Sequence, residues 1–375
     1  MSRPQPVLYH EQAASLYTDG ARFDAEMADV FTRHWLLAAP LDALPDRGAL
    51  AVTVAGRDLV VTRDRSRLGA FHNVCSHRGS ALVEDRTEGP RLRCGFHGWT
   101  YDLAGQLVAV PGRRRFGDGL VLDTCSLAAV AAHSWGGFVW VHLGEQPTPF
   151  EAWLGAFAGE IERYRMDRQH VFAERVDEVA LNWKATVDAF NETYHVAFIH
   201  PDSVGRFVEG NASWFRYSGP HSRMVIPVRL TLSESQGRAQ EERPRSVDKD
   251  LLPEQAVDHC NYTIFPNVIL NLLPTWGIVL QFDPESVDRT QLRTWMLADP
   301  AASDRQSRAF ERQWGEFSQT LDQDIRSIGA IARGMRSPAF RTVRFGGAEE
   351  RLVHFHRAVD DTLHAAGSRA SLADG

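Results

Sequence analysis

The sequence predicts an α+β protein with two domains: a small, mostly β domain, then a larger one in which helices pack on an antiparallel sheet. The first observation is length, because 375 residues suffice for two domains of about 150 residues each. The second is a change of pattern, since short β-rich runs punctuated by Gly and Pro fill residues 50–145 and helical stretches begin after Pro149. The third is a hydrophobic fraction of 43%, which indicates a sizeable core.

The first elements are expected near the N-terminus. Residues 22–38 place apolar side chains close to helical spacing, which predicts an amphipathic helix. It belongs to an N-terminal helical segment, residues 1–36, that we expect to pack on the second domain. The small β domain is expected at residues 37–148, where the run LAVTVAGRDLVVTR has two β-rich halves around Ala55 and Gly56 and predicts a hairpin.

The second domain is expected at residues 149–375. Helical patterns occupy three segments, residues 181–199, 305–335 and 347–365. Four β-rich runs suit one antiparallel sheet, and they begin at Arg223, Tyr262, Trp276 and Gln291. The polar stretch 233–250 contains no aromatic residue, and we expect a mobile loop there, near a site entrance.

Composition narrows the partners. Lys and Arg number 41 against 48 Asp and Glu, a net charge of −7, which argues against nucleic acid and anionic membranes as partners. The N-terminus has no apolar signal segment and no later stretch is long enough to span a membrane, so we expect a soluble, cytoplasmic protein. A small-molecule substrate or a protein partner remains.

Four cysteines are too few to stabilise a chain of this length through disulfide bonds, so we expect them to be free thiols or metal ligands. Cys125 and Cys260 have no partner at ligand spacing, so we expect buried, small hydrophobic residues. The other two lie in the patterns Cys75-x-His77 and Cys94-x-x-His97. Each loop offers one thiolate and one imidazole, so the two can hold one metal site from opposite sides. The alternative is a zinc knuckle or a chance cluster, although structural zinc sites usually draw on CxxC pairs.

Glycines surround these four residues, and Gly79, Gly95 and Gly98 are expected to let the backbone turn tightly. The segments CSHRGSAL and RCGFHGWTYDLAGQL resemble the Rieske motif of ring-hydroxylating oxygenases. The resemblance implies an all-β Rieske domain with a [2Fe–2S] cluster, in which the two cysteines bind one iron and the two histidines the other. Gly95-Phe96 replaces the Pro-Tyr or Ser-Tyr common in the family.

A second group of candidate ligands lies in residues 188–200. Glu192 and His195 are three residues apart and share a helical face, whereas His200 is five residues beyond His195, about 140° around a regular helix. A local bulge or the end of the helix before Pro201 must therefore bring His200 round. From the residues alone, an ordinary helix with two histidines is the alternative.

The pattern Asp188-x3-Glu192-x-Tyr194-His195-x4-His200 resembles the iron-binding helix of the same oxygenase family. The resemblance implies that His195 and His200 bind a mononuclear non-haem Fe(II). It takes the third, carboxylate ligand from a C-terminal helix, here Asp324 in the segment QDIRSIGAIARGM, with Asp322 as the alternative. It also implies a helix-grip, START-like catalytic domain.

Glu192 resembles the family's acidic bridge, which joins an iron histidine, here His195, to a Rieske histidine, here His97, of a neighbouring subunit. Ala189 stands where the family usually has an asparagine. The residues considered as candidates for the substrate pocket are Ala189, Phe190, Val196 and Trp276.

The resemblance implies the oxygenase (alpha) component of a Rieske non-haem iron system, expected to be a homotrimer. The chain has no G-x-G-x-x-G fingerprint, so electrons are expected from a separate NAD(P)H-dependent reductase, in some systems through a ferredoxin. The expected reaction is hydroxylation or oxidative demethylation of a small aromatic compound with O2. A quaternary or methylated amine is the alternative, with Trp276, Trp214 and Phe215 as a cation–π surface. A Rieske electron carrier without a catalytic iron is a third interpretation.

Overall fold

The computed structural model describes residues 9–229 and 250–373. The chain forms two compact units: a small unit, Phe31–Phe150, and a large unit that combines the N-terminal residues as far as Val30 with the chain from Glu151 onwards. The first division precedes the boundary expected at residue 36. Residues 233–249 of the expected loop lie outside the described residues. In the described part of the chain, no helix is both long enough and apolar enough to cross a membrane.

The small unit is built from two antiparallel sheets, one of seven strands in the order β2-β11-β10-β5-β4-β3-β6 and one of three in the order β7-β8-β9. The strands are β2 Leu36–Pro40, β3 Arg47–Val54, β4 Arg57–Asp64, β5 Arg67–His72, β6 Arg86–Glu88, β7 Arg91–Arg93, β8 Thr100–Asp102, β9 Leu107–Ala109, β10 Ala129–Trp135 and β11 Phe138–His142, and one short helix, α3 Phe31–Arg33, precedes them. The predicted hairpin is confirmed as β3 and β4. Ala55 and Gly56 both have positive φ (49° and 71°), as a two-residue turn of this hand requires.

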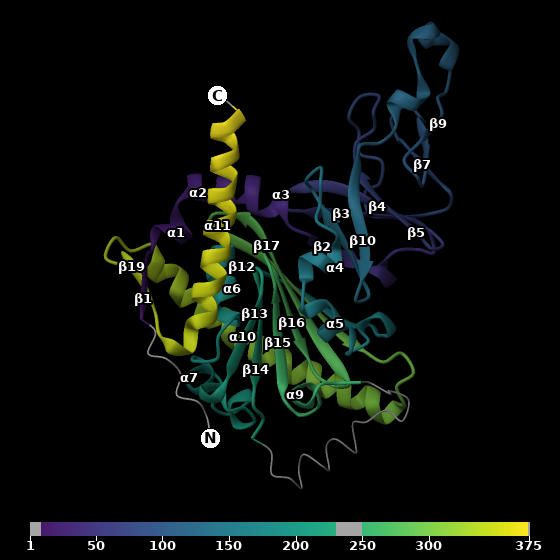
Figure 1. Ribbon diagram of the computed structural model, residues 1–375. Helices are drawn as coiled ribbons and strands as arrows, with labels where there is room; N and C mark the ends of the chain where they lie inside the picture. The colour runs from purple at the N-terminus through teal and green to yellow at the C-terminus, as the bar shows by residue number, and fades with distance from the viewer. Residues whose placement is uncertain (1–8, 230–249, 374–375) are drawn as a thin grey trace. The chain divides into compact units, whose positions relative to one another are not determined.

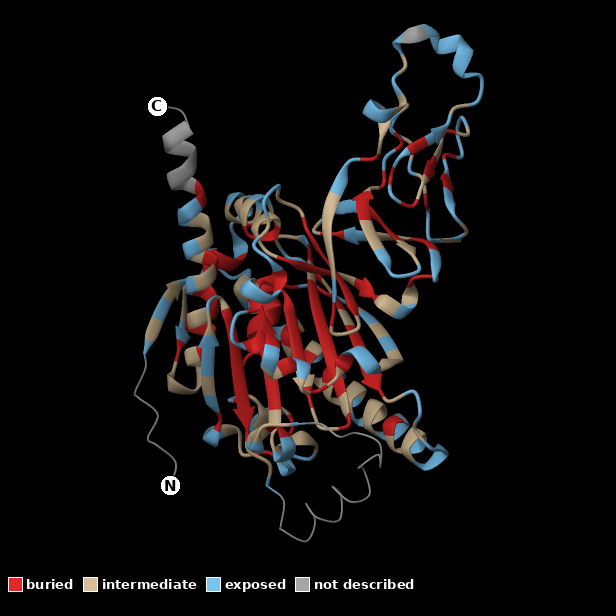
Figure 2. Cartoon of the chain, turned by 45° about the vertical axis from the view of Figure 1, so that its right-hand side comes forward, coloured by how far each residue is buried: buried red, intermediate tan, exposed pale blue. Residues whose placement is uncertain are grey.

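The large unit contains a seven-stranded antiparallel sheet (Figure 1). Its strand order is β12-β18-β17-β16-β15-β14-β13. Its strands are β12 His170–Val179, β13 Trp214–Ser218, β14 His221–Ile226, β15 His259–Ile264, β16 Val268–Leu272, β17 Trp276–Ser286 and β18 Arg289–Ala298. The expected single sheet is confirmed, and the run that begins at Tyr262 supplies parts of two strands. The central strands are buried along most of their length (Figure 2). An outer pair, β1 His10–Ala13 and β19 Thr342–Phe345, joins distant parts of the chain.

The helices are α1 Ser15–Thr18, α2 Gly20–Ala25, α4 Phe150–Leu154, α5 Phe157–Glu162, α6 Trp183–Phe190, α7 Val196–Ile199, α9 Pro253–Val257, α10 Asp304–Met335 and α11 Glu350–Ala373. The two predicted C-terminal helices are confirmed as α10 and α11. The helix expected over residues 22–38 is wrong, because α2 passes into a π-helical turn, Glu26–Val30, and strand β2 begins at Leu36. The prediction of a single helix over residues 181–199 is also wrong, because this segment forms two helices, α6 and α7.

Side chains on the two faces of the large sheet meet different helices. Asn261 and Thr263 of β15 contact Arg351 of α11, and Phe282 of β17 packs on Phe190 of α6 with 5.4 Å between ring centroids. We call this side the helix face. Because successive side chains of a strand point to opposite sides, Tyr262 lies on the other face, where it packs edge-on against Phe157 and Tyr164 beside α5.

Buried polar contacts tie the N-terminal segment to α6. Glu26 and Lys184 are both fully buried and form an ion pair with 2.5 Å between Oε2 and Nζ, and the indole Nε1 of Trp183 donates to the same carboxylate at 2.9 Å. Burial lowers the pKa of Lys184, and the charge of Glu26 opposes that effect. The N-terminal segment is therefore part of the core of the large unit.

Candidate functional site

Two loops of the small unit present the four Rieske-type candidates, and their hydrogen bonds are equivalent. In the first loop Gly79 N donates to Cys75 O (2.9 Å), and in the second Gly98 N donates to Cys94 O (3.0 Å). Gly79 and Gly98 have φ of 79° and 72°, as expected for tight turns. Gly95 does not have a positive φ, so the expectation that it permits the turn is wrong. Local spacing thus produces two matched ligand loops.

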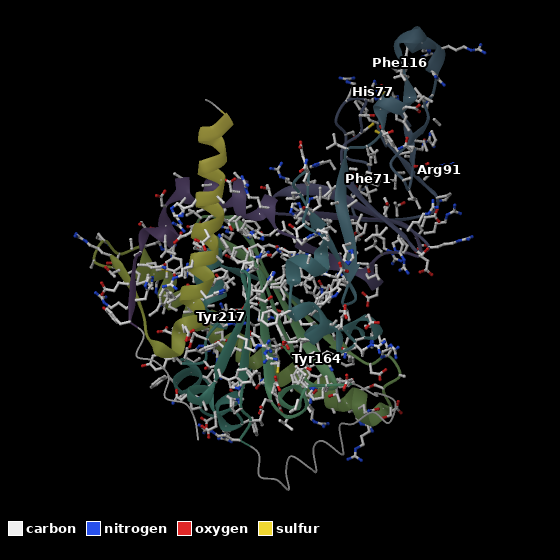
Figure 3. All side chains as sticks on the ribbon, in the orientation of Figure 1. Phe71, His77, Arg91, Phe116, Tyr164 and Tyr217 are labelled. Carbon is white, nitrogen blue, oxygen red and sulfur yellow. The ribbon has the colours of Figure 1, made fainter. Side chains whose placement is uncertain are left out.

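The side chains of these loops suit a [2Fe–2S] cluster. Cys75 and Cys94 are 1% and 3% exposed, and the rings of His77 and His97 lie 4.6 Å apart, with His77 also near Phe116 (Figure 3). Burial raises the pKa of Cys94, but hydrogen bonds from the backbone N–H groups of Phe96 and His97 and from Cys75 lower it overall. Thiolates are the form that binds iron, so the donor set fits the group that the sequence predicts.

Tyr101 is a further residue at this site that the sequence analysis missed. It is fully buried, and its hydroxyl lies 3.3 Å from Cys75 Sγ and 2.8 Å from Ser76 Oγ. Trp99 stacks on the ring of His77 with 4.8 Å between centroids. Both residues lie in the segment RCGFHGWTYDLAGQL, but nothing in their spacing indicated these contacts.

The large unit brings the three candidates for a mononuclear metal together. Ligand atoms of His195, His200 and Asp324 all lie within 4.8 Å of one another. Asp324 Oδ1 is 2.7 Å from His200 Nε2 and 3.6 Å from His195 Nε2. Two imidazoles and one carboxylate are the ligands of non-haem iron sites with open positions.

The outer nitrogens of both imidazoles are held by neighbouring acceptors. His195 Nδ1 donates to Glu192 Oε1, and His200 Nδ1 donates to Gln323 Oε1 at 2.6 Å. The Nε2 lone pairs of both rings therefore face the carboxylate of Asp324, an arrangement of acceptors that a cation stabilises. Burial lowers the pKa of His200, but Asp324 and Gln323 raise it overall, which also indicates a position that favours positive charge.

A break in the helix, rather than a regular helical face, brings the histidines together. His195 is the N-cap residue of α7 and His200 its C-cap residue, with φ −119° and ψ 38°. The expected helix end before Pro201 is therefore present. Glu192 and His195 do interact, although neither lies within a helix, because α6 ends at Phe190 with Asn191 as its C-cap residue.

Two acidic candidates have other partners. Asp322, the alternative third ligand, is bonded to Arg175 at 2.6 Å with half of its side chain exposed, so it does not join the two histidines. Asp188 accepts from Tyr17 (2.5 Å) and from His356 Nε2 (2.9 Å) and thereby ties α6 to the N-terminal segment and to α11. Asp188 is thus an anchor of the helix that precedes the site.

The pocket candidates lie in different surroundings. Phe190 contacts Phe282 on the helix face, and Val196 packs against a cluster that includes Met224. Trp276 begins β17 and shares the parity of Phe282, which places it on the helix face, and Ala189 is half-buried in α6.

The expected cation–π surface is divided between the faces. Trp214 and Phe215 are neighbours in one strand and so point to opposite sides. The ring of Trp214 is already covered by the guanidinium of Arg223, 4.9 Å from its centroid. Trp214 therefore cannot join Phe215 and Trp276 in one surface.

The remaining cysteines differ. Cys260 is fully buried in β15, where burial raises its pKa to about 11, as expected for a small core residue. Cys125 is half-buried at the edge of the small unit's core, so the expectation of full burial is wrong there.

The segments that contain the two sites match two protein families. Residues 161–365 match the family described as ring hydroxylating alpha subunit (catalytic domain), and residues 34–129 match the Rieske [2Fe-2S] domain. The chain belongs to the ring-hydroxylating alpha-subunit family. Its Rieske domain carries the [2Fe–2S] cluster, and the catalytic domain of this family holds a mononuclear iron. The family resemblance stated from the motifs is confirmed.

Relatives within this family differ in their named substrates. The chain is 32% identical over 203 residues to a glycine betaine monooxygenase oxygenase subunit of Chromohalobacter salexigens, a match that spans 53% of this chain and 45% of that subunit. It is 25% identical over 320 residues to the large oxygenase component of a naphthalene 1,2-dioxygenase system of Pseudomonas putida, covering 76% of this chain and 70% of the relative.

A solved structure of similar fold is a quaternary ammonium Rieske monooxygenase in complex with L-carnitine. Its TM-score is 0.78 at 20% identity, and the match covers 96% of this chain and 97% of that one. This likeness confirms the α+β fold of a ring-hydroxylating alpha subunit.

Proposed function

We propose that this chain is the oxygenase component of a Rieske non-haem iron system, which uses O2 and externally supplied electrons to hydroxylate or oxidatively demethylate a small organic substrate. The observation that carries the proposal is the convergence of His195, His200 and Asp324 within 4.8 Å. An electron carrier without a catalytic iron has no need for that convergence. The two-motif arrangement, with one donor set in each unit, supports the same function.

His195, His200 and Asp324 would hold the mononuclear iron through their inward-facing atoms. Bound there, an iron with two imidazoles and one carboxylate supplies open positions for O2 activation beside a substrate. Glu192 and Gln323 keep a proton on each Nδ1, so both Nε2 atoms stay available as ligands. Asp188 and Lys184 fix the helix α6 that leads into the site.

The proposed partners are a separate NAD(P)H-dependent reductase, with or without a ferredoxin, and two further copies of the chain in a homotrimer. In that assembly Glu192 would connect His195 to His97 of a neighbouring subunit. Glu192→Gln keeps the shape of the side chain but removes its charge, so we expect both metals and the oligomer to persist while electron transfer slows. Stopped-flow reoxidation of the reduced cluster measures the rate, and a wild-type rate in the variant would contradict this relay.

Two substrate classes are supported by different observations. The relative from the naphthalene system and the apolar side chains Phe190 and Phe282 support an aromatic compound. The relative from the glycine betaine system supports a methylated or quaternary amine. Product analysis after incubation with O2, reductase and members of each class separates the two.

Iron content and substrate-dependent O2 uptake together test the proposed oxygenase function. We expect about three irons per chain in the wild type, two in the cluster and one mononuclear. Asp324→Asn should lower this to about two and stop substrate-dependent O2 uptake while the visible spectrum of the cluster persists. Asp322→Asn is the matched control, because this aspartate bonds Arg175 instead. Two irons per chain and no O2 uptake in the wild type would support the electron carrier.

A further inference from the structure

One row of side chains crosses the helix face from strand to strand. Directly paired residues of antiparallel strands share a face, and the register links Phe215, Met224, Asn261, Asn271, Ile278 and Met296 in that order. Four of the six are apolar. The two asparagines occupy the middle of the row, where a sheet that only packed on helices would carry apolar side chains.

This row lies beside the proposed iron site. Met224 belongs to an apolar cluster with Val208 and Ile226, against which Val196 packs. Val196 is the residue directly after the candidate ligand His195. Neighbouring strands are about 4.8 Å apart, so Asn271 lies roughly 10 Å across the sheet from Met224.

A buried arginine fixes the orientation of both asparagines. Arg351 is fully buried, and its contacts within the described residues are to neutral oxygens, with Nη1 2.5 Å from Asn261 Oδ1. Because a guanidinium only donates, Asn261 Oδ1 must accept. Asn261 Nδ2 is then the donor to Asn271 Oδ1, at 2.7 Å.

The chain of hydrogen bonds that runs from Arg351 through Asn261 ends at the amide nitrogen of Asn271. Its oxygen is occupied, so Nδ2 is left as a free donor, and no acceptor for it is found in the described part of the chain. Asn271 is half-buried, whereas Asn261 and Ile278 on either side of it are 4% and 1% exposed. The side chain of Asn271 thus reaches space that its neighbours in the row do not.

A second chain of hydrogen bonds from Arg351 also ends at an amide nitrogen. Arg351 Nη2 donates to Thr263 Oγ1, and Thr263 Oγ1 donates to Asn191 Oδ1, both at 2.6 Å. Asn191 Nδ2 is therefore also a donor end, and it is fully buried with no hydrogen-bond partner in the described structure. Asn191 directly precedes Glu192, so this donor also belongs to the segment that holds the iron ligands.

We propose that Asn271 is a specificity-determining residue whose Nδ2 donates to a carboxylate oxygen of the substrate, with the uncompensated charge of Arg351 favouring that anion. The inference rests on the proposed function and deepens it, since it selects substrates that carry a carboxylate, whether the rest of the molecule is an aromatic ring or a methylated amine. A hydrocarbon bound beside Asn271 would leave this donor without a partner, which disfavours binding.

The test compares the holoenzyme with Asn271→Leu, which keeps the approximate volume and removes the donor. Binding is measured by calorimetry for two pairs of probes, benzoate against toluene and glycine betaine against tetramethylammonium. We expect a carboxylate to bind the wild type more tightly than its acceptor-free counterpart. Asn271→Leu should weaken carboxylate binding roughly 10- to 100-fold, and Asn271→Asp should weaken it further, because an acceptor then faces an anion.

The matched control is Gln291→Leu, which removes a half-buried amide from β18 on the opposite face of the same sheet, where it pairs with Asp283. We expect it to bind carboxylates as the wild type does. Equal loss in both leucine variants, or no preference for the carboxylate in either pair, overturns the inference. Asn271-dependent carboxylate binding without any O2 uptake supports the inference and contradicts the proposed oxygenase function instead.

Discussion

The ion pair between Glu26 and Lys184 predicts a large and specific loss of stability. Both side chains are fully buried, and the carboxylate also accepts from Trp183 at 2.9 Å and from Arg22 at 3.0 Å. Glu26→Ala leaves the ammonium of Lys184 in the core without its counter-charge. Breaking one side of a buried pair costs about 3–5 kcal/mol, so we expect the free energy of unfolding of the large unit to fall by that amount.

Two comparisons isolate the cause. The double variant Glu26→Leu with Lys184→Met removes both charges and should recover most of the loss, because well-packed apolar groups replace buried pairs with little cost. Glu11→Ala breaks an ion pair with Arg344 in which both side chains are exposed (45% and 61%), and we expect a much smaller loss of stability, because solvent screens exposed pairs. Urea unfolding at pH 7, followed by circular dichroism, gives all three values.

The pH dependence gives a second measurement on the same variant. Burial lowers the pKa of Lys184 below its ordinary value of 10.5, and Glu26 opposes that shift. Without Glu26 the shift is larger, so the unfolded chain binds more protons than the folded one over a wider range below pH 10.5. The variant should therefore gain stability as pH rises from 7 to 9, and more steeply than the wild type. A loss no greater than that of Glu11→Ala, with no such gain, would refute the reasoning.

Three further outcomes follow from single contacts. Tyr101→Phe removes a hydrogen bond to Cys75 worth about 1 kcal/mol and should lower the cluster's reduction potential by roughly 40 mV in a redox titration, whereas an unchanged potential would contradict the contact. Gln323→Leu removes the acceptor for His200 and should weaken iron binding at the mononuclear site about 10- to 100-fold in a chelator competition. His221 is fully buried, which lowers its pKa from 6.5 to about 4, so the protein loses stability as pH falls through this range. Over the same pH range the free energy of unfolding of His221→Gln should fall by about 3 kcal/mol less than that of the wild type, as measured by unfolding titrations.

The parts of the sites that local spacing determines could be predicted from the sequence. Cys75, His77, Cys94 and His97 lie in two short loops, and each loop closes on a hydrogen bond between its own glycine and cysteine. The hairpin at Ala55 is equally local. In such segments the residues that make the structure are the residues that the pattern contains.

The break between α6 and α7 could not be predicted in the same way. Helical periodicity continues through residues 181–199, but Asn191 leaves the helix, and its side chain accepts from Thr263 on a strand 72 residues away. Glu26, the first residue of the π-helical turn, likewise pairs with a distant residue, the buried Lys184. A contact made with a distant strand or helix carries no signal in the window where the helix ends.

The candidate iron site depends on such distant contacts more than on its own secondary structure. The helix α7 between the two histidines has four residues, and helices so short are not stable by themselves. The geometry of the two histidines must therefore come from the segments that hold them. These are Gln323 and Asp324 of α10 on one side and α6 on the other. The N-terminal segment anchors α6 through Glu26 and Tyr17, so residues near the start of the chain help to position the site through their contacts with this helix.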